Sequence, residues 1–280
     1  MTSNPQPPLD PPTGSLGILD RLLRGGFTDP ESLQGSGISI PIKTLVKMAL
    51  IFGMLYGAMM GLFALFSWET KSDALKQLVS TSIKVPLLYL LTLLVTFPSL
   101  YVVSALARTR LGAADTGRLL LVAMAVNLAL LASLGPITAF FTVSTDSYPF
   151  MILLNVLFFA IAGLVGLAFL RRAIGNLLTT NDDDALAPVT TGEEDSQATG
   201  ENPLDAVSHR RTRDSFQASA ADRTKRLLGT WCLLFGVVGC QMGWILRPFI
   251  GDPELPFQIF RERSSNFFSA VVDALGKLLS

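Results

Sequence analysis

The stretch MALIFGMLYGAMMGLFALF, residues 48–66, decides the fold, because its nineteen residues include no charged side chain. At about 1.5 Å of rise per residue, a helix of this length crosses the roughly 30 Å of hydrocarbon in a bilayer. Four later windows are equally free of charge, namely residues 85–107, 119–143, 149–170 and 227–246. The sequence therefore predicts an all-α protein, a polytopic membrane bundle of five transmembrane helices.

Composition supports this prediction. Only 16% of the residues are charged and 50% are hydrophobic, whereas a soluble domain usually carries about 25% charged residues. The net charge is zero, so no overall field favours nucleic acid, and we expect no nucleic-acid partner.

The distribution of basic residues predicts the topology. With five spans, fifteen of the 22 Lys and Arg side chains fall on the side of the N-terminus and seven on the other side. The window 119–143 contains Gly135-Pro136, so it is either one kinked span or a re-entrant hairpin of two half-spans. A hairpin would divide the basic residues eleven to eleven, and the positive-inside rule therefore favours a single span. We expect a cytoplasmic N-terminus and an extracytoplasmic C-terminus.

The polar parts of the chain divide it further. Residues 1–43 read as a flexible cytoplasmic tail with a possible short amphipathic helix, and 44–172 hold the first four spans. Residues 173–225 read as a cytoplasmic loop that is first acidic and then basic, with disorder expected from Thr179. The fifth span occupies 226–247. Residues 248–280 read as an extracytoplasmic loop and an amphipathic helix, whose apolar stripe starts at Phe257.

No Asp, Glu, Lys, Arg or His side chain lies inside any of the five windows. Proton-coupled pumps and metal transporters need such groups at depth, so this absence argues against them. The intramembrane polar residues are Asn127, Asn155 and Gln241, which either bond neighbouring helices or line a path for a small neutral solute. We find no catalytic, metal-binding or cofactor-binding constellation, and expect no cofactor.

Glycines recur at helical spacing in two spans. Gly53, Gly57 and Gly61 share one face of the first span, and Gly239 and Gly243 share a face of the fifth. Small residues spaced in this way let helix backbones approach closely. They predict tight packing within the chain, with association between copies as the alternative.

Arg247 directly follows the fifth span, and Trp244 lies one turn before it. A long basic side chain at a helix end either reaches toward lipid phosphates or bonds the last carbonyl groups of the helix. We expect these two residues at the membrane interface, in contact with lipid.

Several segments resemble bacterial membrane proteins related to the Yip (Ypt-interacting protein) family, an uncharacterised branch. They are KVPLLYLLT at 84–92, FPSLY at 97–101 and GCQMGWILRPF at 239–249, within a resemblance that covers about 44–279 without the acidic loop. The resemblance implies a five-span helical fold with a cytoplasmic N-terminus. Eukaryotic relatives bind small GTPases in vesicle traffic, but the N-terminal tail departs from theirs, and no activity of bacterial relatives carries over.

These observations lead to a functional hypothesis. We expect a non-enzymatic, multi-pass integral membrane protein of the bacterial inner membrane that scaffolds partners or organises the membrane. Its partners would be lipids, proteins bound through residues 179–226, and a second copy of the chain. The alternatives are a channel or facilitator for a small neutral solute, and an accessory subunit of a membrane enzyme complex.

Overall fold

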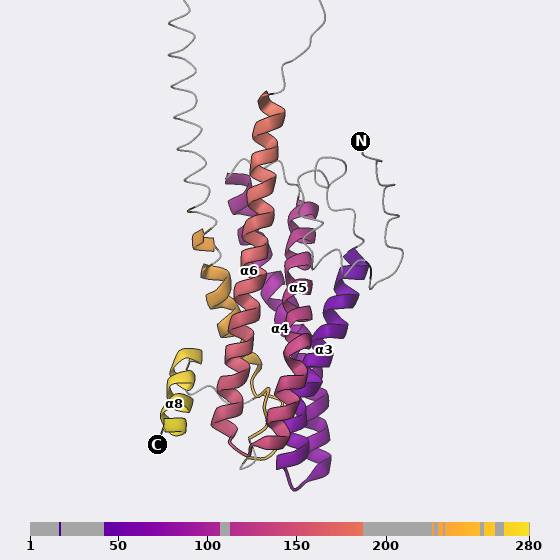
Figure 1. Ribbon diagram of the computed structural model, residues 1–280, viewed down its shortest axis with the longest axis vertical. Helices are drawn as coiled ribbons and strands as arrows, with labels where there is room; N and C mark the ends of the chain where they lie inside the picture. Colours follow the sequence, from indigo (N-terminus) through magenta and orange to yellow (C-terminus); the bar gives the residue numbers. More distant parts are fainter. Residues whose placement is uncertain are drawn as a thin grey trace, which may run out of the picture.

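The computed structural model describes residue 17 and residues 42–106, 113–186, 226, 229–231, 233–252, 255–260 and 266–279. Regular structure in this part of the chain is helical throughout, which confirms the predicted all-α fold. Five of its helices are long and apolar enough to cross a membrane, and they run side by side along the long axis (Figure 1). The protein is a multi-pass integral membrane protein.

The spans follow one another up and down the bundle. They are α3 (Ile42–Ser67), α4 (Lys71–Leu106), α5 (Ala113–Ser144), α6 (Tyr148–Leu186) and the fifth span, Gly229–Leu246. The short connections after Ser67 and after Ser144 lie at one end, which we call the hairpin end. The third window is a single helix that includes Pro136, so it is not a hairpin of two half-spans.

The helix α6 is longer than its apolar window. It continues to Leu186, through Asp182, Asp183 and Asp184, and the expectation of disorder from Thr179 is wrong for these residues. No proline interrupts the sequence between Pro149 and Pro188, so nothing stops backbone hydrogen bonding at the edge of the apolar window. The rest of the 179–226 loop lies almost wholly outside the described residues.

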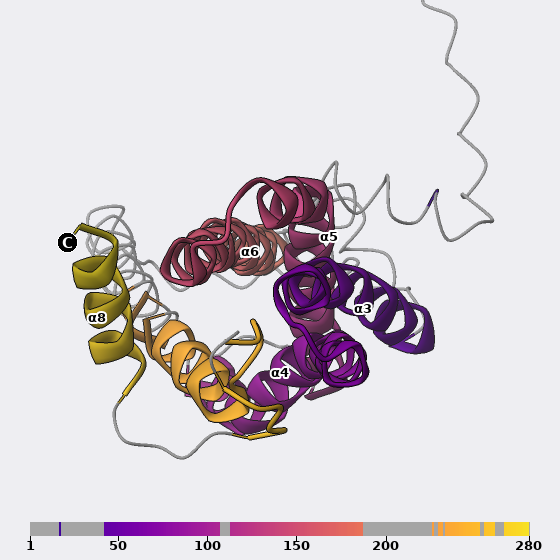
Figure 2. The ribbon, with the colours of Figure 1, turned by 90° about the horizontal axis from the view of Figure 1, so that it is seen from below.

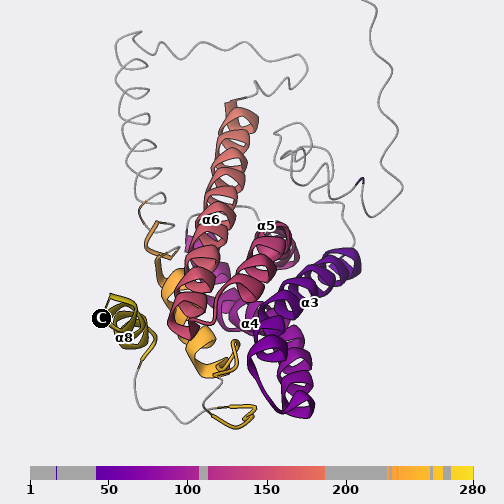
Figure 3. The ribbon, with the colours of Figure 1, turned by 60° about the horizontal axis from the view of Figure 1, so that its bottom comes forward.

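The C-terminal helix starts later than its apolar stripe. The amphipathic helix α8 covers Phe267–Leu279, whereas residues 255–260 are not helical, so the expected start at Phe257 is wrong. Asn266 sets the start, because its Oδ1 accepts a hydrogen bond from the backbone N–H of Ser269 at 2.9 Å. The helix packs beside α6 (Figures 1 and 3).

The first two spans approach each other through glycine. A Cβ atom added at Gly57 would lie 2.5 Å from the carbonyl oxygen of Thr81, and one added at Gly53 would lie 2.9 Å from Pro86 Cβ. Gly61 meets the backbone of Leu78 at 2.8 Å in the same way. All three glycines of α3 therefore lie directly against the backbone of α4, along a little more than two turns.

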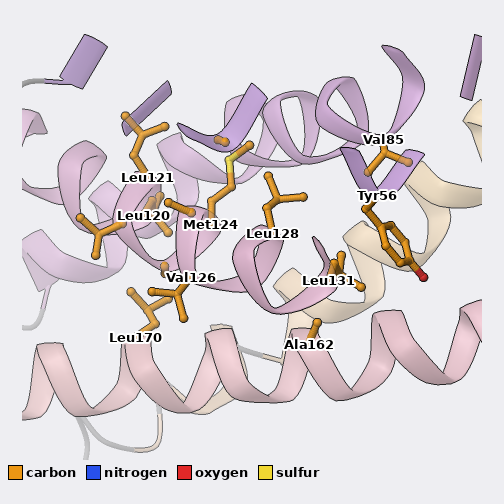
Figure 4. Close-up of a cluster of buried hydrophobic side chains, with 14 of the residues drawn as sticks. Tyr56, Val85, Leu120, Leu121, Met124, Val126, Leu128, Leu131, Ala162 and Leu170 are labelled. Atoms are coloured by element: carbon orange, nitrogen blue, oxygen red, sulfur yellow. The ribbon is translucent and has the colours of Figure 1, made fainter. Parts of the chain in front are cut away.

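The core lies around α5, which α3 and α6 flank (Figure 2). Eight consecutive residues of α5, from Leu119 to Val126, are buried. Figure 4 shows part of this core, where Tyr56 of α3, Leu131 of α5 and Ala162 of α6 lie near one another. The interior is filled by apolar side chains from all sides of the bundle.

We predict that Gly57→Ala lowers the free energy of unfolding by about 1–3 kcal/mol, because the new methyl group must push α4 away. Gly163→Ala is the matched control, since a Cβ there meets no atom within 4 Å, and we expect a change within about 0.5 kcal/mol. Unfolding of the detergent-solubilised protein measures both. Equal stability of the two variants would contradict the close approach of α3 and α4.

Candidate functional site

A polar cluster on α4 fixes the chain that follows the fifth span. Gln77, Thr81 and Lys84 are spaced four and three residues apart, so they share one face of the helix. All three are buried, with Gln77 and Thr81 fully inaccessible. We call this cluster the α4 clasp, and we call residues 247–252 and 255–260 the return loop.

The clasp binds backbone carbonyl groups of the return loop. Gln77 Nε2 donates to Phe249 O at 3.0 Å and to Pro248 O at 3.3 Å. Thr81 Oγ1 lies 2.7 Å from Phe249 O. Carbonyl groups in a loop have no helical partner, so buried donors must satisfy them. The clasp supplies these donors at the hairpin end of the bundle.

Lys84 carries the only formal charge of the clasp. Its ammonium group donates to Pro248 O at 3.2 Å and to the carbonyl of Ile259, and it lies 5.1 Å from the centre of the Phe260 ring. The side chain is only 4% exposed. A buried ammonium group is stable only where such dipoles replace water. Lys84 therefore joins two separate parts of the return loop to α4.

The return loop also packs on the other spans. Gly251 lies on the indole ring of Trp68 so closely that an added Cβ would be 2.6 Å from Trp68 Cζ2. The hydroxyl group of Tyr148 donates to the carbonyl of Ile250 at 3.5 Å. Pro248 and Ile250 are buried. Contacts with α3, α4 and α6 thus hold the return loop in place at the hairpin end.

Arg247 and Trp244 lie at the start of this loop. The guanidinium carbon of Arg247 is 3.7 Å from the centre of the Trp244 ring, which is a stacked cation–π contact. Both side chains are half-buried. The predicted lipid contact of these two residues stays a prediction.

Two of the three predicted polar residues bond neighbouring helices. Tyr56 of α3 donates to Oδ1 of Asn155 on α6 at 2.8 Å, and Tyr89 of α4 donates to Oδ1 of Asn127 on α5 at 3.2 Å. The two asparagines are thus hydrogen bonded to different tyrosines. Gln241 is half-buried on the fifth span and is hydrogen bonded to neither asparagine.

A small cavity lies beside Asn127. It has a volume of about 30 Å³, and its lining comes from α4, α5, α6 and Phe235 of the fifth span. This volume is close to that of one water molecule in the liquid. Of the three predicted polar residues, Asn127 alone lines this cavity.

The glycines of the fifth span do not pack as predicted. A Cβ added at Gly243 would meet no atom within 4 Å, and one at Gly239 would only touch Thr92 Cγ2 at 3.9 Å. The expectation of tight packing within the chain is therefore wrong for these two positions. Trp231, Phe235 and Leu246 face the bundle. Gly239 lies at the edge of that face, where the helix is too far from α4 for backbone contact, and Gly243 lies further round the helix.

No family model, no curated protein and no solved structure matches the chain. The resemblance to the Yip family therefore stays a prediction.

Sequence reasoning missed the α4 clasp. Its three residues precede the apolar window 85–107, so they read as ordinary polar residues outside the membrane. Their spacing was the available signal, since Gln77, Thr81 and Lys84 share one face of the helix, but Lys76, Ser80 and Ser82 beside them are polar as well. Their partners are backbone carbonyl groups more than 160 residues away, which no side-chain pattern marks.

We predict that Lys84→Met lowers the free energy of unfolding by about 1–3 kcal/mol, because buried carbonyl groups of the return loop lose their donor. Lys76→Met is the matched control. Lys76 is exposed on the same helix and pairs only with Asp73, so its loss costs at most about 1 kcal/mol.

Limited proteolysis of the same variants locates the effect. The Lys84→Met protein is cut faster within residues 248–260, whereas the Lys76→Met protein is cut like the wild type. Unchanged proteolysis of both variants would show that the clasp does not hold the return loop.

Proposed function

We propose that this protein is a non-enzymatic scaffold of the membrane, which binds a second copy of itself through the fifth span. The observation that carries the proposal is the poor burial of this helix. Only 12% of its central window is buried, against 28–61% for the other four spans. The bundle is therefore packed around the first four spans, and the fifth keeps most of its surface for other contacts.

Small residues run along the fifth span. An added Cβ at Gly229, Gly236 or Gly243 would meet no atom of the described residues within 4 Å, and Cys240 is half-buried on the same side. In lipid, helices associate where small residues let their backbones approach. Such a face is self-complementary, because a two-fold axis brings the same glycines of two copies together. It supports a dimer formed by two fifth spans.

The interior supports a scaffold rather than a carrier. Tyr56 and Tyr89 use Asn155 and Asn127 to join helices, and the cavity beside Asn127 holds about one water molecule. Neither Asn155 nor Gln241 lines that cavity. A solute path through the three residues therefore has no support from their positions.

We also propose that the N-terminus is cytoplasmic and that the membrane is a bacterial inner membrane. The support is the excess of basic residues on the side of the N-terminus, fifteen against seven. The hairpin end, with the return loop, would then face the extracytoplasmic side. Recruitment of proteins by residues 179–226 stays a prediction.

We predict that oxidation links two copies through Cys240 in membranes that contain the Cys232→Ser protein. Gly236→Leu places a large side chain on the contact face, so we expect the cross-linked dimer to fall at least tenfold on a non-reducing gel. Gly163→Leu, at an equally open glycine of α6, should leave the dimer unchanged.

Two results would refute the proposed dimer. One is the absence of any Cys240 cross-link in the membrane. The other is a cross-link of equal yield in the Gly236→Leu and Gly163→Leu proteins. A cross-link to a different protein would identify the fifth span as a docking helix for that protein instead.

The orientation is tested by single cysteines in a chain without Cys232 and Cys240. Asp146 is exposed at the hairpin end and Lys43 is exposed at the other end. A membrane-impermeant maleimide should label Asp146→Cys on intact spheroplasts, and Lys43→Cys only after permeabilisation. The reverse pattern would invert the proposed topology.

A further inference from the structure

The cavity beside Asn127 lies where four spans meet. Its lining includes Tyr89 and Leu93 of α4, Met124 and Asn127 of α5, Gly163 of α6 and Phe235 of the fifth span. Most of the lining is apolar, and its only polar side chains are those of Tyr89 and Asn127. Its mostly apolar lining with two polar side chains repeats the pattern of ligand sites on a smaller scale.

Asn127 has a hydrogen-bond donor to offer there. Its side chain is 7% exposed, and its Oδ1 already accepts the hydrogen bond from Tyr89. Its Nδ2 lies 3.3 Å from the position of a Cβ added at Gly166, which also lines the cavity, and among the described residues no acceptor is bonded to it. A buried amide N–H group without an acceptor is unfavourable, most of all in a low dielectric. The position therefore favours a molecule that brings an oxygen acceptor.

The depth of Asn127 restricts the kind of molecule. Asn127 follows Arg118, at the start of the third span, by nine residues, which is about 13 Å along a helix. It therefore lies close to the middle of a hydrocarbon layer of roughly 30 Å. The ester groups of phospholipids lie at the edge of that layer, so they do not reach Nδ2. The ligand must be uncharged and able to enter the centre of the membrane.

The shape of the cavity further restricts the kind of molecule that can bind. The innermost space of about 30 Å³ accepts one oxygen-sized group, and the cavity is open on one side, so the oxygen of a ligand occupies this space while its apolar part lies toward the opening. Gly163 lies at the α6 side of the cavity, and a Cβ added there would meet nothing within 4 Å. The open space at this glycine leaves room for the apolar body of the molecule.

We propose that this cavity is a binding site for an uncharged, membrane-dissolved molecule whose carbonyl or hydroxyl oxygen accepts a hydrogen bond from Nδ2 of Asn127. The apolar body of the molecule lies on the side of Gly163, where an added Cβ would meet no described atom within 4 Å. Tyr89 orients the site, because its hydroxyl group fixes Oδ1 of Asn127 and so turns Nδ2 toward the ligand. This site is separate from the proposed dimer face.

Benzophenone is a suitable probe, because it is an uncharged apolar ketone that dissolves in bilayers and inserts into nearby C–H bonds on illumination. The full chain in lipid vesicles is illuminated with benzophenone, and the labelled peptides are located by mass spectrometry. We expect label on residues of the cavity lining, above all Met124 and Leu93. Unlabelled diphenylmethane, which lacks the ketone, should compete at least tenfold more weakly than unlabelled cyclohexyl phenyl ketone.

Variants separate binding from general partitioning into the membrane. Gly163→Leu fills the open space and should reduce cavity label at least tenfold, although the position tolerates a side chain. Asn127→Leu should abolish the preference for the ketone competitor. Gly236→Leu, which is expected to weaken the dimer, should leave the cavity label unchanged. The proposed dimer and the proposed ligand site can therefore be refuted separately.

The proposal is overturned if label is spread evenly over lipid-facing residues, if Gly163→Leu leaves the cavity label unchanged, or if both competitors act equally. An even spread would mean that the cavity holds water only.

Discussion

The structure depends on the contact between the glycine face of α3 and the backbone of α4. In lipid the hydrophobic effect does not drive helices together, so their association depends on close packing and on hydrogen bonds. Gly57 lies against the backbone of Thr81 and Ser82, where no larger residue fits. This contact fixes the position of α4, and both the α4 clasp and Tyr89 lie on that helix.

Hydrogen bonds between side chains then join further pairs of helices, and hydrogen bonds from α4 hold the return loop. The pair Tyr56–Asn155 joins α3 to α6, and the pair Tyr89–Asn127 joins α4 to α5. At the hairpin end, Lys84 and its two neighbours on α4 hold the return loop by its carbonyl groups. These polar side chains thus bind buried backbone or amide groups, while the fifth span contributes little to the core.

Local sequence predicted the spans well, because charge-free length is a property of each window by itself. It also pointed to Gly53, Gly57 and Gly61, whose contacts with α4 are seen in the structure. It failed at Gly243, because which face of a helix turns inward depends on neighbours that hydropathy does not identify. It missed the α4 clasp for a related reason, since the partners of Gln77 are carbonyl groups distant in sequence.

The most direct test of the central contact is a distance measurement between α3 and α4 in a lipid bilayer. A Cβ added at Gly57 would lie 2.8 Å from the Cα of Ser82, so the two Cα atoms are close neighbours. Solid-state NMR of protein labelled with ¹³C at glycine and serine should show a cross-peak between them at short mixing time. Its absence, in a spectrum that shows the sequential Gly35–Ser36 and Ser36–Gly37 cross-peaks or other neighbouring Gly–Ser pairs, would contradict the account.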